Sequence, residues 1–164
     1  MLRSNKTDKQ DADKSSLLVI WIVIIAAVAA ALFTSVSFTM PIADGYIRYA
    51  GLAVILIGII FRIIAVRTLG KFFTVDVTIR EGHHLVKKGI YKYFRHPSYT
   101  ASLLTFIGFG ISLNNWYSLL IVVIAVVIVF IMRIRIEEKT LIARFGDEYL
   151  RYKKEAWGLI PFIY

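Results

Sequence analysis

Two clusters of ionisable residues in this 164-residue chain lie beside long apolar segments and could carry chemistry. The first is Arg95-His96-Pro97-Ser98-Tyr99, which opens a run without charged residues that ends at Met132. The second follows that run directly and contains Arg133, Glu137 and Glu138. Ionisable groups at the ends of membrane segments are costly to place there, and they often mark functional sites. The two clusters therefore indicate an active site on one side of a membrane.

Arg133 and Glu137 are four residues apart, so they share one face of a helix. From the residues alone, two interpretations of this pair stay open. One is an exposed salt bridge, which contributes little stability. The other is a pair in a pocket, where the cation binds an anionic acceptor and the anion binds a positively charged cofactor. Glu138 lies about 100° further round the helix and need not join them.

The histidine motif also admits simpler interpretations. Pro97 suits the first turn of a helix, and its basic and aromatic neighbours suit a membrane interface. His83 and His84 could be grouped with His96 as metal ligands. Adjacent histidines point in different directions in an extended chain, and the chain contains no cysteine, so we predict no metal site.

The composition predicts a membrane protein. Hydrophobic residues make up 58% of the chain and the mean hydropathy is +0.68, far above a soluble domain. About 20 apolar residues cross the hydrocarbon core as a helix. We therefore predict an all-α polytopic membrane protein in which a disordered cytoplasmic tail, residues 1–16, precedes one domain, residues 17–164. About four transmembrane helices are expected, at residues 17–39, 46–66, 99–113 and 116–132.

The distribution of basic residues predicts the orientation. The chain has 20 lysines and arginines and a net charge of +9. With four spans, all of them except Arg48 and Arg62 lie on one side, which the positive-inside rule makes cytoplasmic. Both termini and the active site are then expected in the cytoplasm. Topology thus explains the positive charge, and no nucleic-acid partner is predicted.

The parts outside the membrane have local patterns of their own. Residues 72–79 are rich in β-branched and aromatic side chains, so we expect them to be extended or strand-like. The last membrane helix is expected to continue to about Phe145 and to break at Gly146. An amphipathic helix over residues 147–157 would carry Tyr149 and Tyr152 on one side. In the second span, Gly51 and Gly58 lie on nearly the same face and favour a close helix neighbour.

The combined spacing of the motifs closely resembles that of the isoprenylcysteine carboxyl methyltransferase family. The resemblance covers about residues 68–163 and includes the closing segment 158–163, which here has one extra residue. Phospholipid methyltransferases share part of the pattern. The matching residues are Gly89-Ile90-Tyr91, Arg95-His96-Pro97-Ser98-Tyr99, Glu137-Glu138, Leu141, Phe145-Gly146, Tyr149 and Tyr152.

The resemblance implies an S-adenosylmethionine-dependent methyltransferase without a Rossmann fold, and the chain has no Gly-rich dinucleotide loop. Glu137 matches a cofactor-binding glutamate, and Arg133 matches an arginine assigned to the acceptor, so these two are the expected catalytic residues. Asp76 falls near a position where some members have a polar amide, and this departure leaves it without an assigned role. The other expected cofactor-binding residues are His83, His84, Leu85, Val86, Tyr91, His96, Pro97, Ser98 and Tyr99.

The predicted function is methylation of the carboxylate of an isoprenylcysteine-like or other lipid-like acceptor. The lipid bilayer and a lipophilic acceptor are the expected partners, and the cytoplasmic 67–98 loop and the C-terminal helix are expected to cover the cofactor. Eukaryotic members have a longer amino-terminal half, so the resemblance does not fix the acceptor. Two alternatives stay open: a phospholipid amine N-methyltransferase, which would need a base such as Glu138, and a non-catalytic scaffold or lipid-binding protein.

Overall fold

The structure of the protein is a computed structural model that describes residues 4–70 and 85–160. Within these residues the regular elements are all helical, which confirms the predicted fold class. The strand-like segment expected at residues 72–79 lies outside the described residues. The elements are α1 (Ser4–Ser37), α2 (Ile47–Leu69), the short 3-10 helix η2 (Gly89–Lys92), α3 (Pro97–Ser112), α4 (Trp116–Phe145) and α5 (Asp147–Glu155).

Three of these helices are long and apolar enough to cross a membrane: residues Ser16–Ser37 of α1, the whole of α2, and α4. The fourth long helix, α3, has 16 residues and is therefore about 24 Å long. Helix α1 extends beyond its apolar part, because it begins at Ser4, within the tail that the sequence predicts to be disordered. Extending an existing helix adds one hydrogen bond for each residue fixed, so polar residues can continue a helix that an apolar segment has nucleated.

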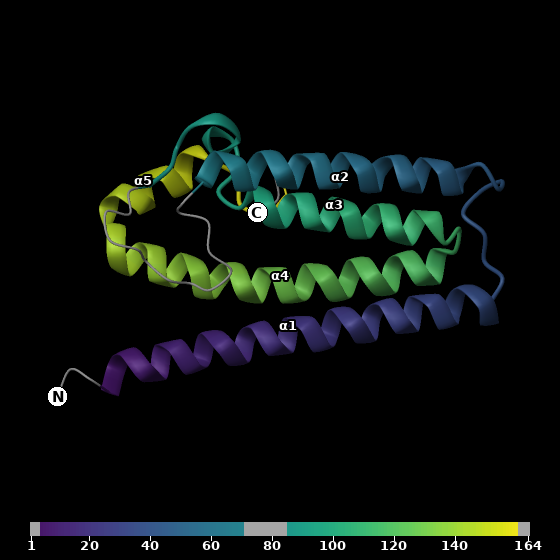
Figure 1. Ribbon diagram of the computed structural model, residues 1–164, viewed down its shortest axis with the longest axis horizontal. Coiled ribbons are helices and arrows are strands. Elements are labelled where there is room, and N and C mark those ends of the chain that lie inside the picture. The colour runs from purple at the N-terminus through teal and green to yellow at the C-terminus, as the bar shows by residue number, and fades with distance from the viewer. Residues whose placement is uncertain (1–3, 71–84, 161–164) are drawn as a thin grey trace.

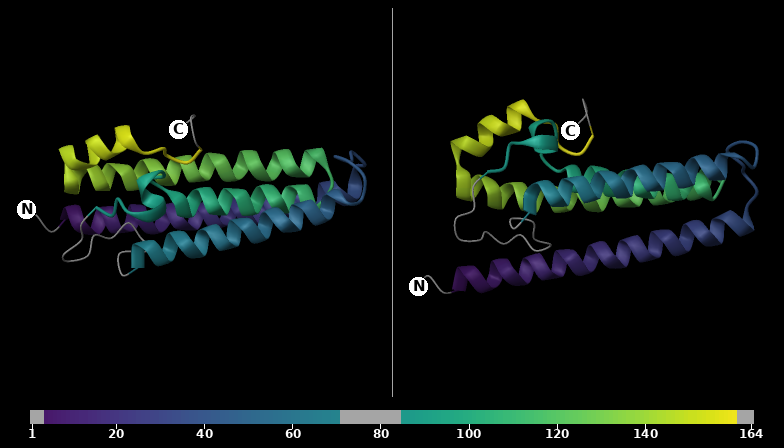
Figure 2. Two further views of the ribbon diagram at one scale, coloured as in Figure 1. Left: turned by 90° about the horizontal axis from the view of Figure 1, so that it is seen from above. Right: turned by 45° about the horizontal axis from the view of Figure 1, so that its top comes forward.

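The four long helices lie in a row in the order α2, α3, α4 and α1 (Figure 1). The α1–α2 and α3–α4 connections lie together at one end of the helices. The start of α1, η2 and α5 lie at the other end, as Figure 2 also shows from two further directions. The two polar clusters, which begin α3 and follow the apolar part of α4, are therefore brought to the same end of the molecule.

Glycines allow α2 and α3 to approach closely, as the sequence predicts for Gly51 and Gly58. A Cβ atom on Gly58 would lie 2.9 Å from the Thr105 backbone nitrogen. A Cβ atom on Gly108 of α3 would lie 2.7 Å from the carbonyl oxygen of Gly51. Since these neighbours are backbone atoms, the two helices could not accommodate larger residues without moving apart.

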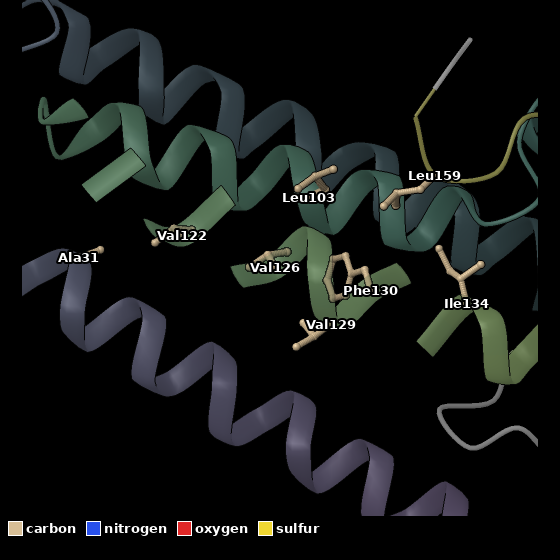
Figure 3. Packing of buried hydrophobic residues seen from close by; sticks show 8 residues of the cluster. All are labelled: Ala31, Leu103, Val122, Val126, Val129, Phe130, Ile134 and Leu159. Atoms are coloured by element: carbon tan, nitrogen blue, oxygen red, sulfur yellow. The ribbon is translucent and has the colours of Figure 1, made fainter. Parts of the chain in front are cut away.

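The main apolar core lies along α4, between α3 and α1 (Figure 3). Phe130 points toward α3, and Val129 lies on the side of α4 that faces α1. The Ser118 hydroxyl of α4 donates a 2.7 Å hydrogen bond to the Ala31 carbonyl of α1 within this core. The core cluster consists of Ala31, Leu103, Val122, Val126, Val129, Phe130, Ile134 and Leu159.

Two asparagines between α3 and α4 hold the α1–α2 connection. The Asn114 side-chain oxygen accepts hydrogen bonds from the backbone nitrogens of Ile42 and Ala43, at 3.0 and 3.2 Å. The buried Asn115 donates to the Phe38 carbonyl at 2.6 Å and caps α4 by accepting a bond from its backbone. Hydrogen bonds therefore join the two connections at this end, which lies far from the polar clusters.

Candidate active site

Two helix boundaries position the polar clusters where the sequence predicts them. Helix α3 begins at Pro97, so His96 stands immediately before its first turn. Helix α4 ends before Gly146, whose positive φ of 52° lets the chain turn back into α5. Because of this turn, α5 folds over the end of α4 and toward the chain segment that precedes α3 (Figure 2).

Backbone and side-chain hydrogen bonds hold the segment before α3 against α5 and the residues that follow it. Phe94 and Trp157 form a parallel β-bridge, and the Arg95 backbone nitrogen donates to the Trp157 carbonyl at 2.7 Å. The Arg95 guanidinium donates to the Lys153 carbonyl at 2.6 Å. The buried Tyr152 hydroxyl donates to the Tyr91 carbonyl at 2.5 Å. Two segments far apart in the sequence thus form one unit at this end of the bundle.

Glu138 is the centre of the charged groups in this unit. Its side chain is only 5% exposed, and one of its oxygens lies 3.0 Å from Arg95 Nε and 3.4 Å from His96 Nε2. The Tyr149 hydroxyl donates to the same oxygen at 3.3 Å. The other oxygen lies 2.6 Å from Lys153 Nζ. Glu138 therefore links α4 to α5 and to the residues before α3.

The buried tyrosines around this network stay neutral hydrogen-bond donors. Burial raises the pKa of Tyr149 well above its usual range, and the nearby negative charge of Glu138 raises it further. Burial likewise raises the pKa values of Tyr91 and Tyr152. Neutral phenols can donate to the Glu138 carboxylate and to backbone carbonyls throughout the physiological pH range.

Arg133 and Glu137 lie at the same end of the helices as the Glu138 network, and Glu137 lies beside His96. Arg133 is 1% exposed, so the pair cannot be an exposed salt bridge. The Glu137 side chain is 31% exposed, and one of its oxygens lies 3.7 Å from His96 Nδ1. The Tyr99 side chain lies near both Arg133 and Glu137. His96 therefore has one ring nitrogen toward Glu137 and the other toward Glu138.

The structure brings most of the predicted site residues together. One group consists of His96, Tyr99, Arg133 and Glu137, as described above. Tyr91 lies near this group, and the charge of Glu137 helps to raise its pKa. Pro97 and Ser98 form the first turn of α3 between them. Leu85 packs against the cluster that contains Tyr149, and Val86 packs with Tyr91. His83, His84 and Asp76 lie outside the described residues.

Sequence reasoning missed the central position of Glu138, and it did not assign partners to Arg95 and Lys153. The helical angle between Glu137 and Glu138 suggested that Glu138 need not join the site. In the structure α4 is covered on more than one face here, by α5 and by the segment before α3, so side chains about 100° apart are both enclosed. The adjacent arginine and the second glutamate of the motif were the available signals.

Comparison with known proteins identifies the family. The sequence signature of the isoprenylcysteine carboxyl methyltransferase family matches residues 51–143. The chain belongs to this family. The match contains every described residue predicted for the site, together with Glu138, whereas α1 and α5 lie outside it.

Curated relatives of this isoprenylcysteine carboxyl methyltransferase family member include two enzymes from yeast and a plant. The chain is 38% identical over 128 residues to the protein-S-isoprenylcysteine O-methyltransferase of Saccharomyces cerevisiae, covering 77% of this chain and 54% of the relative. It is 36% identical over 120 residues to protein-S-isoprenylcysteine O-methyltransferase B of Arabidopsis thaliana, covering 72% and 61%. The chain thus spans little more than half the length of these relatives.

A solved structure of the family shares the fold. This chain superposes on the structure of the eukaryotic intramembrane Ras methyltransferase of this family with a TM-score of 0.74 and 31% sequence identity. The similarity covers 87% of this chain and 52% of that one. The arrangement described above is therefore a fold of this methyltransferase family.

Proposed function

We propose that the chain is an integral-membrane methyltransferase that uses S-adenosylmethionine to methylate the carboxylate of an isoprenylcysteine-like or other lipid-like acceptor. The observation that carries this proposal is the grouping of Arg133, Glu137, Tyr99 and His96 at the end of the helices, within the residues that match the family. A buried cation beside a partly accessible anion provides separate places for an anionic acceptor and a cationic cofactor.

The residues around Glu137 suit S-adenosylmethionine, which carries a positively charged sulfur and an ammonium group. The Glu137 carboxylate is partly exposed, so it remains available to a ligand cation. Aromatic side chains lie beside it, and their ring faces attract cations. Tyr91, His96, Tyr99 and Glu137 would hold the cofactor, with Pro97 and Ser98 fixing the turn between them. The bound cofactor supplies the methyl group.

Arg133 is placed to bind the acceptor carboxylate. A guanidinium can hold a carboxylate through two parallel hydrogen bonds, which fixes both the position and the direction of the nucleophile. A carboxylate is already ionised near neutral pH, so no side chain has to remove a proton. The protein then contributes mainly by holding the two reactants in line, since orientation alone can lower a barrier considerably.

The proposed site faces the cytoplasm. The start of α1, η2 and α5 share one end of the helices, and most of the basic residues in the sequence belong to these segments and the connections between them. The positive-inside rule therefore favours a cytoplasmic position for this end. A soluble cofactor would approach from that side, whereas a lipophilic acceptor would arrive through the bilayer.

Binding and product analysis test the function. Detergent-purified protein should bind S-adenosylhomocysteine saturably in calorimetry. With methyl-labelled cofactor and an isoprenylcysteine acceptor, the product should release volatile methanol in alkali, as an ester does. No saturable binding by folded protein would contradict the proposal. Alkali-stable label on a phospholipid amine would instead indicate N-methylation.

Substitution of the two site residues should separate cofactor from acceptor. Glu137→Gln removes the anion proposed to lie near the cofactor's ammonium group, which S-adenosylhomocysteine keeps, so binding of S-adenosylhomocysteine should weaken by about tenfold or more, the loss expected for one charged hydrogen bond. Arg133→Met should largely spare that binding but lower kcat/KM for the acceptor. Arg133→Lys should recover only part of the activity, because an ammonium lacks the planar fork. Equal, small effects of Glu137→Gln and Arg133→Met on both ligands would contradict these roles.

A further inference from the structure

Arg62 is a cation within a helix that is long and apolar enough to cross the membrane. Helix α2 runs from Ile47 to Leu69, and Arg62 lies seven residues, or about 10 Å, before its end. The helix lies at one edge of the row, and Arg62 is exposed there (Figure 1). A charged residue inside a membrane span is costly without a partner, and it often marks a binding site. Arg62 therefore indicates a ligand, unless the protein itself neutralises the charge.

The protein gives Arg62 an uncharged partner. The guanidinium donates to the hydroxyl of Ser102 in α3, and this hydroxyl donates to the Ser98 carbonyl at 2.9 Å. Within residues 4–70 and 85–160, no carboxylate lies at ion-pair distance from Arg62. A guanidinium has five N–H donors, so the bond to Ser102 leaves most of them for a ligand. The charge of the arginine is likewise left for an anion.

The packing of α2 against α3 gives the depth of Arg62. A Cβ atom on Gly58 would lie 2.9 Å from the Thr105 backbone nitrogen. The two helices run antiparallel, and Arg62 follows Gly58 by about one turn (Figure 1). Arg62 is therefore level with a point within about 6 Å of Pro97, where α3 begins. This is the level at which the apolar part of the bundle gives way to the polar clusters.

Aromatic rings mark the same level. The Phe61 ring centre lies 5.9 Å from that of Phe94, which lies 5.8 Å from the Trp157 ring centre. Trp157 is 38% exposed, and Tyr93, whose carbonyl accepts a hydrogen bond from the Trp157 backbone, is 55% exposed. Exposed tryptophan and tyrosine side chains are typical of the level where acyl chains meet lipid headgroups. Since Phe61 immediately precedes Arg62, the arginine lies at this level too.

We propose that Arg62 binds the phosphate of an anionic phospholipid beside α2 and α3, with the exposed Tyr93 and Trp157 rings at the level of the lipid headgroup. The phosphate supplies the negative charge, and its oxygens fit the planar fork of a guanidinium. Lys92 Nζ lies 5.9 Å from the centre of the Tyr93 ring and adds a second cation. The choline group of phosphatidylcholine would meet this positive charge, which favours an anionic lipid. The proposed site does not depend on methyl transfer.

Thermal unfolding in mixed micelles tests the site. A ligand that binds only the folded protein raises Tm, and at ten times its Kd the increase should be about 3–6 °C for a chain of this size. Phosphatidylglycerol should therefore raise the Tm of detergent-purified protein, whereas phosphatidylcholine at the same mole fraction and inorganic phosphate should not. An equal increase with phosphatidylcholine would overturn the proposal. An increase with inorganic phosphate would assign the site to free phosphate and overturn it likewise.

Substitutions that alter one cation at a time locate the effect. Arg62→Gln should remove most of the Tm increase that phosphatidylglycerol causes. Arg62→Lys should keep part of it, because an ammonium retains the charge but lacks the planar fork. Arg67→Gln is the matched control, since Arg67 is also exposed, carries the same charge and lies in the last turn of the same helix. Equal responses of Arg62→Gln and Arg67→Gln to phosphatidylglycerol would overturn the proposal.

Photolabelling of the unaltered protein keeps the proposal testable if Arg62→Gln does not fold. Phosphatidylglycerol with a diazirine in its headgroup should label peptides that contain residues 58–69 or 92–98. Unlabelled phosphatidylglycerol should compete, and phosphatidylcholine should not. Competed labelling confined to α1 or α4, or no competed labelling, would overturn the proposal. Because labelling needs no turnover, this result is independent of whether the protein forms methyl esters.

Discussion

Replacing Glu138 by glutamine is expected to destabilise the fold much more than the same replacement at Glu137. Glutamine keeps the shape of the side chain but removes its charge. The Arg95 side chain is 6% exposed and lies 3.0 Å from the Glu138 carboxylate, so the substitution would leave a buried cation without its negative partner. Breaking one side of a buried ion pair costs about 3–5 kcal/mol. The Lys153 side chain is 40% exposed, so the loss of its ion pair with Glu138 should add little to this cost.

The expected loss can be measured as a melting temperature. For a chain of this size, 1 kcal/mol corresponds to about 2–4 °C, so Glu138→Gln should lower Tm by about 6–20 °C. Tryptophan fluorescence, to which Trp157 beside the network contributes, can report unfolding of detergent-purified protein. Glu137→Gln should lower Tm by less than about 4 °C, because that side chain is partly exposed and its contact with His96 is 3.7 Å long.

A double substitution tests the physical cause. Adding Arg95→Met to Glu138→Gln removes the uncompensated cation, so the double variant should recover part of the lost Tm. A purely additive decrease would indicate that packing, and not the unpaired charge, causes the loss. Equal melting temperatures for Glu137→Gln and Glu138→Gln would refute the central role that the geometry gives to Glu138.

Two further predictions concern the membrane helices and the opposite end of the molecule. Gly108→Leu should destabilise the protein by about 1–3 kcal/mol, because even the Cβ of the new side chain would lie 2.7 Å from the Gly51 carbonyl oxygen. Thermal unfolding should show this loss, whereas Gly45→Ala should be neutral because the space around Gly45 is open. Asn115→Ala should cost about 1 kcal/mol or more through loss of the α4 cap and of the bond to Phe38; Asn115→Asp should recover the cap alone, and an unchanged Tm for Asn115→Ala would contradict both contributions.

The sequence predicts the helical elements well because local rules determine them. Pro97 starts α3, Gly146 ends α4, and Gly51 and Gly58 mark a close helix contact, each through a backbone property of the residue itself. The gap between the spans predicted at residues 99–113 and 116–132 falls at Asn114-Asn115. Its bonds to the α1–α2 connection join residues more than 70 positions apart, and no local pattern identifies such partners.

Candidate site residues divide in the same way. Arg133 and Glu137 could be singled out because their spacing places them on one helical face. The central position of Glu138 could not be predicted, because it depends on how α5 and the segment before α3 enclose the end of α4. The hydrogen bond that Arg133 donates to Ser16 depends on the packing of α1 against α4, which hydropathy alone does not specify.

Adjacent glutamates at the end of α4 can serve different tasks because successive helical residues point about 100° apart. Glu138 points into the charged network and is almost fully enclosed, whereas Glu137 keeps about a third of its side chain accessible. A carboxylate committed to Arg95 and Lys153 has little capacity left for a ligand. The partly exposed Glu137 retains that capacity, and His96 lies between the two. Glu138, which does not need to touch the cofactor, would thus help to position Glu137, the proposed cofactor-binding carboxylate, through His96.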